Sequence, residues 1–195
     1  MSNCIVKQRS IAKDVSLTGV GLHTGKKVTL TFKPAPENYG YAFVRTDLEH
    51  RPVIEAEANF VVNTQRGTNL EKDGIKIHTS EHVLAALVGM GIDNCIIELD
   101  APEPPIIDGS SKYFVEALEE AGIVTQNAER EEYIVTEIIS YKDEETESEI
   151  ILMPADEYQV VTMVDYGTEV LGTQNANLDT ISDFKEEIAN FSAVF

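Results

Sequence analysis

The chain has 195 residues, of which 43% are hydrophobic and 25% charged, which is enough apolar content for a globular protein of one or two domains. Its net charge of −19 argues against nucleic acid and anionic membrane surfaces as main partners, because binding those requires clustered Lys and Arg. No apolar run approaches the roughly 18 to 20 residues of a membrane span, and the N-terminus lacks the apolar segment of a signal peptide. Cys4 and Cys95 are not expected to form a disulfide, so a reducing compartment, the cytoplasm, is expected.

The first half of the chain predicts a sheet and two helices. Apolar and polar side chains alternate over residues 26–33, as they do in a half-buried strand. Further short strands are expected at residues 41–45, 53–58, 60–62 and 94–99. One helix is predicted to begin after His78 and to end before Ile92, and a second to follow Ser110 or Ser111 and to stop at Gly122. We expect a compact sheet with both helices on one face.

The second half predicts another sheet after a linker. Residues 125–132 have no apolar side chain beyond one alanine, so domains are expected at 1–126 and 127–195. Beyond the linker we expect strands at 133–139, 149–153 and 159–165, a solvated acidic turn at 142–147 and a helix from 180 to 188. Because no second helix follows, this domain is expected to leave an apolar face open and to form an oligomer through residues after about 130.

The motif richest in chemistry is His78-Thr-Ser-Glu-His82. A catalytic zinc needs imidazole or carboxylate ligands and an open position for a water, whose proton a nearby carboxylate can take. The motif matches the H-x-x-E-H pattern of inverted zinc peptidases, which requires both histidines on one face of a helix. Residues 74–77, however, alternate like the end of a strand, and Thr79 and Ser80 are favoured N-cap types. His78 is therefore predicted to lie outside the helix.

Glu81 and His82 are then expected in the first turn of that helix. Its unpaired backbone N–H groups and its dipole favour negative charge, so Glu81 is expected to be ionised and ready as a base, while His82 can bind a metal. The alternative is that Glu81 only interacts with the helix dipole and that His82 is an ordinary surface or core histidine.

A glycine-rich stretch, Thr18-Gly-Val-Gly-Leu-His-Thr-Gly25, has the composition of a phosphate-cradling loop. A dinucleotide fingerprint would follow a strand and open a helix, whereas here a strand follows, so we reject the Rossmann interpretation. The stretch predicts a turn between strands, in which His23 is structural more often than catalytic. Its backbone N–H groups could still face an anion.

Four motifs follow one another along the first part of the chain: Thr18–Gly25, Thr79–His82 followed by Leu84-Ala-Ala-Leu87, Gly91–Asn94 and Pro102–Ser110. Together they resemble the motifs of the UDP-3-O-acyl-N-acetylglucosamine deacetylases, the LpxC family. The resemblance implies a zinc amidase of lipid A biosynthesis in the cytoplasm of Gram-negative bacteria, which removes the acetyl group from an acylated UDP-sugar lipid. It also implies an α+β fold, a two-domain β-α-α-β sandwich of the LpxC type with the active site between the domains.

The same resemblance implies roles for single residues. His82 would be the first zinc ligand and Glu81 the general base, and the loop of His23 would line the active-site cleft, so that His23 is a candidate substrate-binding residue. The family's other two zinc ligands, from a His-Lys-x-x-x-Asp segment, and its later general-acid histidine would lie beyond residue 195. Where the family has an Arg-Thr-Phe stretch, this chain reads Ala189-Asn-Phe-Ser-Ala193.

These departures lead to two hypotheses. The first is zinc-dependent deacetylation as the activity of the parent protein, with an incomplete Zn²⁺ site and an incomplete second domain in this chain, which is expected to be inactive alone. The second is a non-catalytic remnant or scaffold that keeps the fold and binds a nucleotide-sugar or a partner protein.

Overall fold

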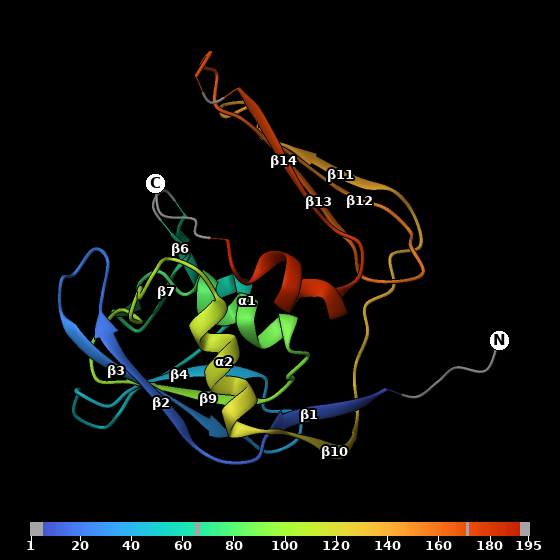
Figure 1. Cartoon of the computed structure of the whole chain (residues 1–195). Helices are drawn as coiled ribbons and strands as arrows, with labels where there is room; N and C mark the ends of the chain where they lie inside the picture. The colour runs from blue at the N-terminus through green and yellow to red at the C-terminus, as the bar shows by residue number, and fades with distance from the viewer. Residues whose placement is uncertain (1–5, 65–66, 171, 192–195) are drawn as a thin grey trace. The chain divides into compact units, whose positions relative to one another are not determined.

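The computed structural model describes residues 6–64, 67–170 and 172–191, which form two compact units (Figure 1). The first unit extends to Arg130 and also includes the segment that begins at Phe184, and the second is Glu131–Asp183. The described elements are mostly strands with few helices, which agrees with the predicted α+β class. The predicted sandwich and its domain boundary after residue 126 stay predictions. None of the described helices is long and apolar enough to cross a lipid bilayer.

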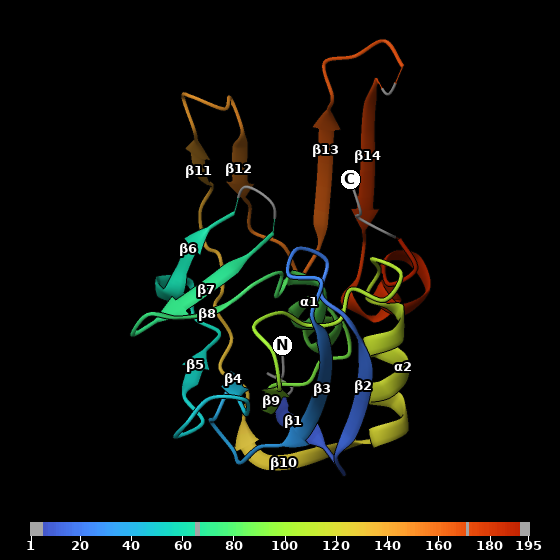
Figure 2. The same ribbon diagram turned by 90° about the vertical axis from the view of Figure 1, so that its left-hand side faces the viewer.

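A five-stranded sheet forms the centre of the first unit (Figure 2). Its strand order is β2-β3-β9-β4-β5, in which β4 and β9 run parallel and the other neighbouring pairs are antiparallel. The strands are β2 (Val15–Val20), β3 (Lys27–Pro34), β4 (Tyr41–Arg45), β5 (Val53–Glu55) and β9 (Cys95–Leu99). The strands predicted at 26–33, 41–45, 53–58 and 94–99 are therefore confirmed, with ends that shift by a few residues in most cases.

Both predicted helices are present, and they pack against one face of this sheet (Figure 1). Helix α1 spans Glu81–Gly89 and α2 spans Lys112–Ala121. The buried side chains on the two helices are Val83, Ala86, Leu87, Phe114, Val115, Ala117, Leu118 and Ala121. The ring of Phe114 packs edge-on against Phe32 of β3, with 6.3 Å between the ring centroids, a geometry that aromatic pairs favour. The apolar stripe that predicts α2 is thus the stripe that attaches it to the sheet.

A three-stranded antiparallel sheet, β6-β7-β8, precedes α1 in the chain. Its strands are β6 (Val61–Asn63), β7 (Asn69–Lys72) and β8 (Ile75–Ile77), and the 3-10 turn η1 (Ala58–Phe60) leads into β6. Strand β8 ends at Ile77 and α1 begins at Glu81, so His78 lies outside the helix, as predicted.

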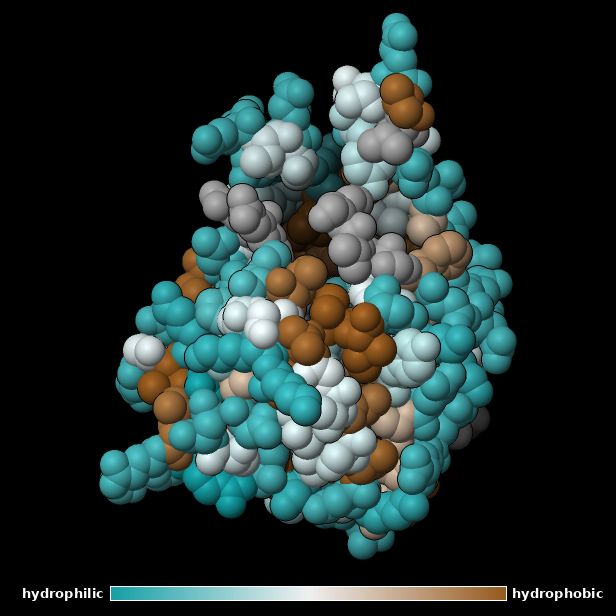
Figure 3. Space-filling model, turned by 60° about the vertical axis from the view of Figure 1, so that its left-hand side comes forward, coloured by the Kyte–Doolittle hydropathy of each residue, from teal (hydrophilic) through white to brown (hydrophobic). Residues whose placement is uncertain are grey.

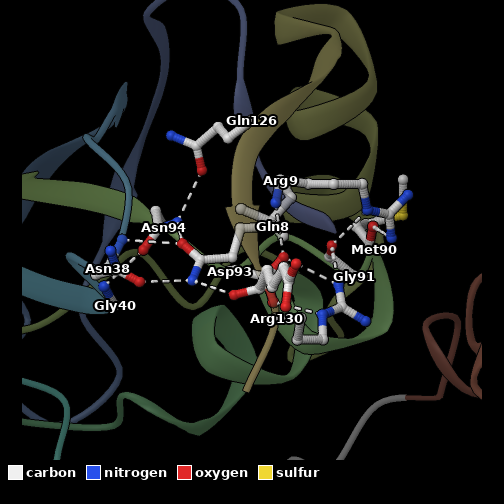
Figure 4. Close-up of polar contacts among 12 residues, drawn as sticks. Gln8, Arg9, Asn38, Gly40, Met90, Gly91, Asp93, Asn94, Gln126 and Arg130 are labelled. Carbon is white, nitrogen blue, oxygen red and sulfur yellow. Dashed lines mark hydrogen bonds and ion pairs between the residues drawn. The ribbon is translucent and has the colours of Figure 1, made fainter. Parts of the chain in front are cut away.

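The predicted linker at residues 125–132 is wrong, because β10 (Ile123–Glu129) forms an antiparallel ladder with β1 (Lys7–Ile11). Polar contacts hold β10 in place (Figure 4). The Asn94 side-chain amide donates to Gln126 and to Gln8, each at 2.8 Å. A strand held by hydrogen bonds needs no apolar stripe, so hydrophobic periodicity does not reveal it.

Two arginines extend the same network to Asp93 (Figure 4). The backbone N–H of Arg9, in β1, donates to the Asp93 carboxylate at 2.7 Å. Arg130, directly after β10, donates to both carboxylate oxygens of Asp93 at 2.7 and 2.9 Å. These bonds tie the β1–β10 pair to the connection between α1 and β9.

The predicted helix over residues 180–188 is not an α-helix. The 3-10 turn η2 (Ile181–Asp183) is followed by the π-helical turn η3 (Phe184–Ile188). The buried ring of Phe184 lies against Gly89 of α1, so closely that a Cβ on Gly89 would lie 2.0 Å from the ring. Lys185 forms an ion pair with Glu119 of α2 at 2.6 Å. The η3 turn therefore contacts both helices, through Phe184 and Lys185. The apolar pattern alone does not predict that this segment is a π-helical turn.

The second unit contains two antiparallel hairpins. They are formed by β11 (Ile139–Lys142) with β12 (Glu149–Leu152), and by β13 (Val160–Asp165) with β14 (Thr173–Leu178). The strands predicted at 149–153 and 159–165 are confirmed, whereas residues 133–138 of the predicted strand 133–139 are not in a strand. The acidic turn is an exposed hairpin end, as predicted, where backbone N–H groups of Thr146 and Glu145 hold the pKa of the Asp143 carboxyl below its usual value.

Candidate functional site

The glycine-rich stretch at residues 18–25 forms the end of β2 and the turn into β3. The Gly21 N–H donates to the Lys26 carbonyl at 2.9 Å, and the Gly25 N–H donates to the Gly21 carbonyl at 3.0 Å. This geometry confirms the predicted turn between strands and excludes a dinucleotide fingerprint, which would open a helix. The side chain of His23, within the turn, is exposed.

Glu103 is a buried carboxylate that binds the backbone of this turn. Its side chain, with a residue exposure of 0%, accepts the His23 N–H at 3.1 Å, and it accepts the N–H and the hydroxyl of Thr24 at 2.8 Å each. Burial raises the pKa of Glu103, but the hydrogen bonds from Thr24, His23 and Thr79 outweigh burial and hold the pKa below its ordinary value. Glu103 is therefore a buried anion that hydrogen bonds stabilise.

Gly21 allows the turn to approach Glu103 closely. A Cβ at this position would lie 2.5 Å from the Glu103 Oε2 atom and 2.5 Å from the Thr24 Oγ1 atom. Both distances are shorter than van der Waals contact, so any larger residue requires one of these bonded atoms to move.

Thr79 joins the same carboxylate from the segment before α1. Its hydroxyl donates to the Glu103 Oε1 atom at 2.8 Å. The backbone of Thr79 has a φ of +52°, a left-handed conformation that costs non-glycine residues about 1 to 3 kcal/mol and is rare for β-branched ones. The bond to Glu103 therefore helps to hold a strained turn that directs the chain into α1.

Neither predicted N-cap residue caps α1 with its side chain. The Thr79 hydroxyl goes to Glu103, and the Ser80 hydroxyl donates to the Thr68 carbonyl at 2.9 Å. Tertiary partners take both hydroxyls, so the residue types are those of a cap while the contacts are not.

Glu81 is the first residue of α1 and is half-buried. Its Oε2 atom accepts the Thr68 N–H at 2.8 Å, and the Ser80 N–H donates to the Thr68 carbonyl at 3.0 Å. The start of the helix also favours the negative charge of Glu81. A carboxylate oriented in this way can accept a proton from a water, as a general base does.

The two histidines of the H-x-x-E-H match do not share a helical face. His82 is the second residue of α1, and its backbone carbonyl accepts the Ser111 hydroxyl at 3.1 Å. His78 precedes the helix, and its Nδ1 atom lies 3.1 Å from the Asn69 side-chain oxygen. The inverted zinc peptidase pattern is therefore absent, while the roles of Glu81, His82 and His23 stay predictions.

Within the part of the chain that the structure describes, no group of three or more His, Cys, Asp or Glu side chains is placed to hold a metal ion. Catalytic zinc sites usually have three protein ligands. His82 stays a candidate for one such ligand.

Apolar surface borders the turn. On the face shown in Figure 3, hydrophobic side chains form a patch near the centre, and smaller hydrophobic areas are scattered over a mostly hydrophilic surface. Val20, Leu22 and Ile107 have exposed fractions of 49%, 43% and 38%. The Ile106 N–H donates to the Val20 carbonyl at 3.0 Å, which places this segment beside the end of β2. The end of β2, the turn and the segment of Ile107 therefore present exposed apolar side chains beside one another.

Glu103 and Thr68 contact the candidate site residues, although no sequence motif marks either of them for this role. Glu103 lies between Pro102 and Pro104 in a stretch of mainly apolar residues, and a charged residue in such a stretch needs buried partners. The position of a charged residue among apolar ones therefore indicates buried partners for Glu103, but it does not identify them as the His23 turn and Thr79. Thr68 acts through its backbone, which leaves no trace in residue type.

Known proteins match nearly the whole chain. Residues 8–193 match the model of the LpxC family, UDP-3-O-acyl N-acetylglycosamine deacetylase. The bifunctional enzyme LpxC/FabZ of Chlorobaculum tepidum is 46% identical over 188 residues, which are 96% of this chain and 40% of that protein. Its counterpart in Bacteroides thetaiotaomicron is 43% identical over 185 residues, 95% of this chain and 40% of that protein.

A third relative is named for the deacetylase alone. The UDP-3-O-acyl-N-acetylglucosamine deacetylase of Myxococcus xanthus is 42% identical over 183 residues, which are 93% of this chain and 58% of that protein. This chain thus spans 40% of the two bifunctional relatives and 58% of the third. Since the family match covers far more than half of its residues, the chain belongs to the UDP-3-O-acyl N-acetylglycosamine deacetylase (LpxC) family.

Proposed function

We propose that this chain provides the general base and one metal ligand for removal of the acetyl group from UDP-3-O-acyl-N-acetylglucosamine, a step of lipid A biosynthesis. The observation that carries the proposal is the pair Glu81 and His82 at the start of α1, in a chain that belongs to the deacetylase family. The apolar side chains beside the His23 turn support a substrate that has an acyl chain next to a polar sugar.

In this proposal Glu81 accepts the proton of the water that attacks the acetamide carbonyl. Its carboxylate is suited to that step because the Thr68 N–H orients it at 2.8 Å and the start of α1 stabilises its charge. His23 lies in the turn that binds Glu103 and is the candidate substrate contact. Zinc is the proposed metal, with His82 as the ligand that this chain supplies.

The test uses a chimeric protein in which this chain replaces the matching residues of the Chlorobaculum tepidum relative. Glu81→Gln is expected to keep the zinc content and to lower deacetylation by about two to four powers of ten, the usual contribution of a positioned base. His82→Asn is expected to lose zinc. The matched control is His78→Asn, because this histidine belongs to the same motif but lies outside the helix.

The measurements are turnover of the acylated UDP-sugar and zinc per protein. Near-normal turnover in Glu81→Gln would show that another group is the base. A folded, zinc-loaded chimera without turnover would favour the alternative, a scaffold that binds a nucleotide-sugar or a partner protein without catalysis.

Two further parts of the proposal concern the surroundings of the protein. We propose the cytoplasm as its location, since a free, buried Cys95 fits a reducing compartment. We also propose self-association through residues after about 130, because Val161 and Met163 are 76% and 73% exposed. Sedimentation of the chain at tens of micromolar, at moderate salt, tests the second point, and a monomer that binds no hydrophobic dye would contradict it.

A further inference from the structure

One buried side chain connects the two segments of the candidate site. The Glu103 carboxylate accepts hydrogen bonds from His23 and Thr24 in the β2–β3 turn, and from Thr79 before α1. The turn lies about 80 residues away in the sequence and Thr79 lies 24 residues away, so neither contact is local.

The two segments lie between regular elements, where local hydrogen bonds such as Gly21 N–H to Lys26 and Ser80 N–H to Thr68 fix each one separately. The His23 and Thr24 backbone N–H groups donate to the buried Glu103 carboxylate and not to water, so their hydrogen bonds depend on Glu103. Thr79 is in a left-handed conformation, which persists in a non-glycine residue only where the surroundings enforce it. A charged acceptor that receives donors from both sides enforces both conformations at once.

Glu103 itself is held firmly. Pro102 and Pro104 restrict the backbone on either side of it. The Pro102 carbonyl also accepts the His78 N–H at 2.9 Å, next to the bond from Thr79 to Glu103. The segment of Glu103 is thus attached at two successive points to the residues that lead into α1.

We propose that Glu103 is a positioning residue that couples the conformation of the His23 turn to that of the start of α1, and so keeps His23 in a constant arrangement with Glu81 and His82. Its importance for turnover rests on the proposed function, whereas the coupling itself does not. A Glu103 that only stabilises the fold would strengthen each segment independently, without coupling one to the other.

The test follows amide hydrogen exchange in the full 195-residue chain. Thr79→Val removes one hydroxyl donor and keeps the shape, Thr79→Ser keeps the donor, and Glu103→Gln replaces the charged acceptor. In Thr79→Val the exchange of the His23 and Thr24 amides is expected to rise by about tenfold, because Thr79 shares the Glu103 carboxylate with them and a hydrogen bond to a buried charge is lost. Thr79→Ser is expected to restore protection.

A double-mutant cycle tests the path of the coupling. In a Glu103→Gln background, Thr79→Val is expected to cause no further increase at His23 and Thr24. Glu98→Gln is the matched control, since it removes a carboxylate on β9 that pairs with Lys33 and Arg51, and it is expected to leave both amides protected.

The outcomes are distinct. Unchanged exchange at His23 and Thr24 in Thr79→Val, or an equal effect of Thr79→Val with and without Glu103, would overturn the proposal. If Glu103→Gln does not fold, the pair of Thr79 variants in the parent chain still decides the question. Coupled exchange together with an inactive, zinc-loaded chimera would contradict the proposed function and leave the coupling intact.

Discussion

Gly21→Ala is expected to destabilise the first unit through the contact with Glu103. A methyl group at this position would lie 2.5 Å from the Glu103 Oε2 atom and 2.5 Å from the Thr24 Oγ1 atom, which are themselves bonded at 2.8 Å. Separating them far enough to admit the methyl group breaks this bond, since O–H···O hydrogen bonds have donor–acceptor distances of about 2.5 to 3.0 Å. The φ of Gly21 is not positive, so the backbone itself accepts alanine.

The magnitude follows from two opposing terms. A lost hydrogen bond to a charged group costs about 1.5 to 3 kcal/mol. Replacing glycine by alanine recovers about 0.4 to 1 kcal/mol by restricting the unfolded chain. The free energy of unfolding is therefore expected to fall by about 0.5 to 2.6 kcal/mol, which lowers the urea midpoint by about 0.3 to 1.3 M if m is near 2 kcal/mol/M.

The assay monitors urea unfolding by the labelling of Cys95, which lies buried in β9 of this unit and becomes accessible on unfolding. A Cys4→Ser background leaves Cys95 as the labelled thiol. The control is Gly25→Asn in the same turn. Gly25 has a φ of +62° and nothing within 4 Å of a Cβ, and asparagine tolerates this conformation, so a change below about 0.5 kcal/mol is expected. Equal stability of Gly21→Ala and the parent chain would refute the close packing of the turn on Glu103.

Three further results are expected. Phe184→Ala should release its segment from α1, seen as faster amide exchange there, because its ring fills the space over Gly89; unchanged exchange would show that the ring does not hold the segment. Burial raises the pKa of the Cys95 thiol to about 12, which lowers its thiolate fraction at pH 8 by about 1000-fold. In the Cys4→Ser background, thiol reagents at pH 8 should therefore label the folded chain about 1000-fold more slowly than the urea-unfolded chain, and equal rates would contradict that burial. Because the folded pKa of Glu103 lies below its ordinary value of 4.5, the stability that this charge contributes is present above pH 4.5 and is lost as the pH falls through the folded pKa. The difference in unfolding free energy between the parent and Glu103→Gln should therefore shrink in acid, and a difference independent of pH would contradict this sign.

Regular elements could be predicted from the sequence wherever one face of a strand or helix is buried. The alternation over residues 26–33 predicts β3, and apolar spacing after His78 predicts α1, because each pattern repeats with the period of the element. The position of Glu81 and His82 in the first turn of α1 follows from the same pattern. The β10 strand is not predictable in this way, because hydrogen bonds from polar residues such as Asn94 stabilise it and no apolar stripe is needed.

The order of residues alone predicts that Glu81 and His82 lie together at a helix start, because neighbours in the chain remain neighbours in any fold. What orients these two side chains depends on contacts between distant segments. Glu103 meets the His23 turn and Thr79 across about 80 and 24 residues of sequence, and the Thr68 backbone meets Glu81 across 13. Such contacts are single hydrogen bonds between segments far apart in the sequence. They form no periodic pattern in the sequence, because they depend on how the sheet and α1 pack together.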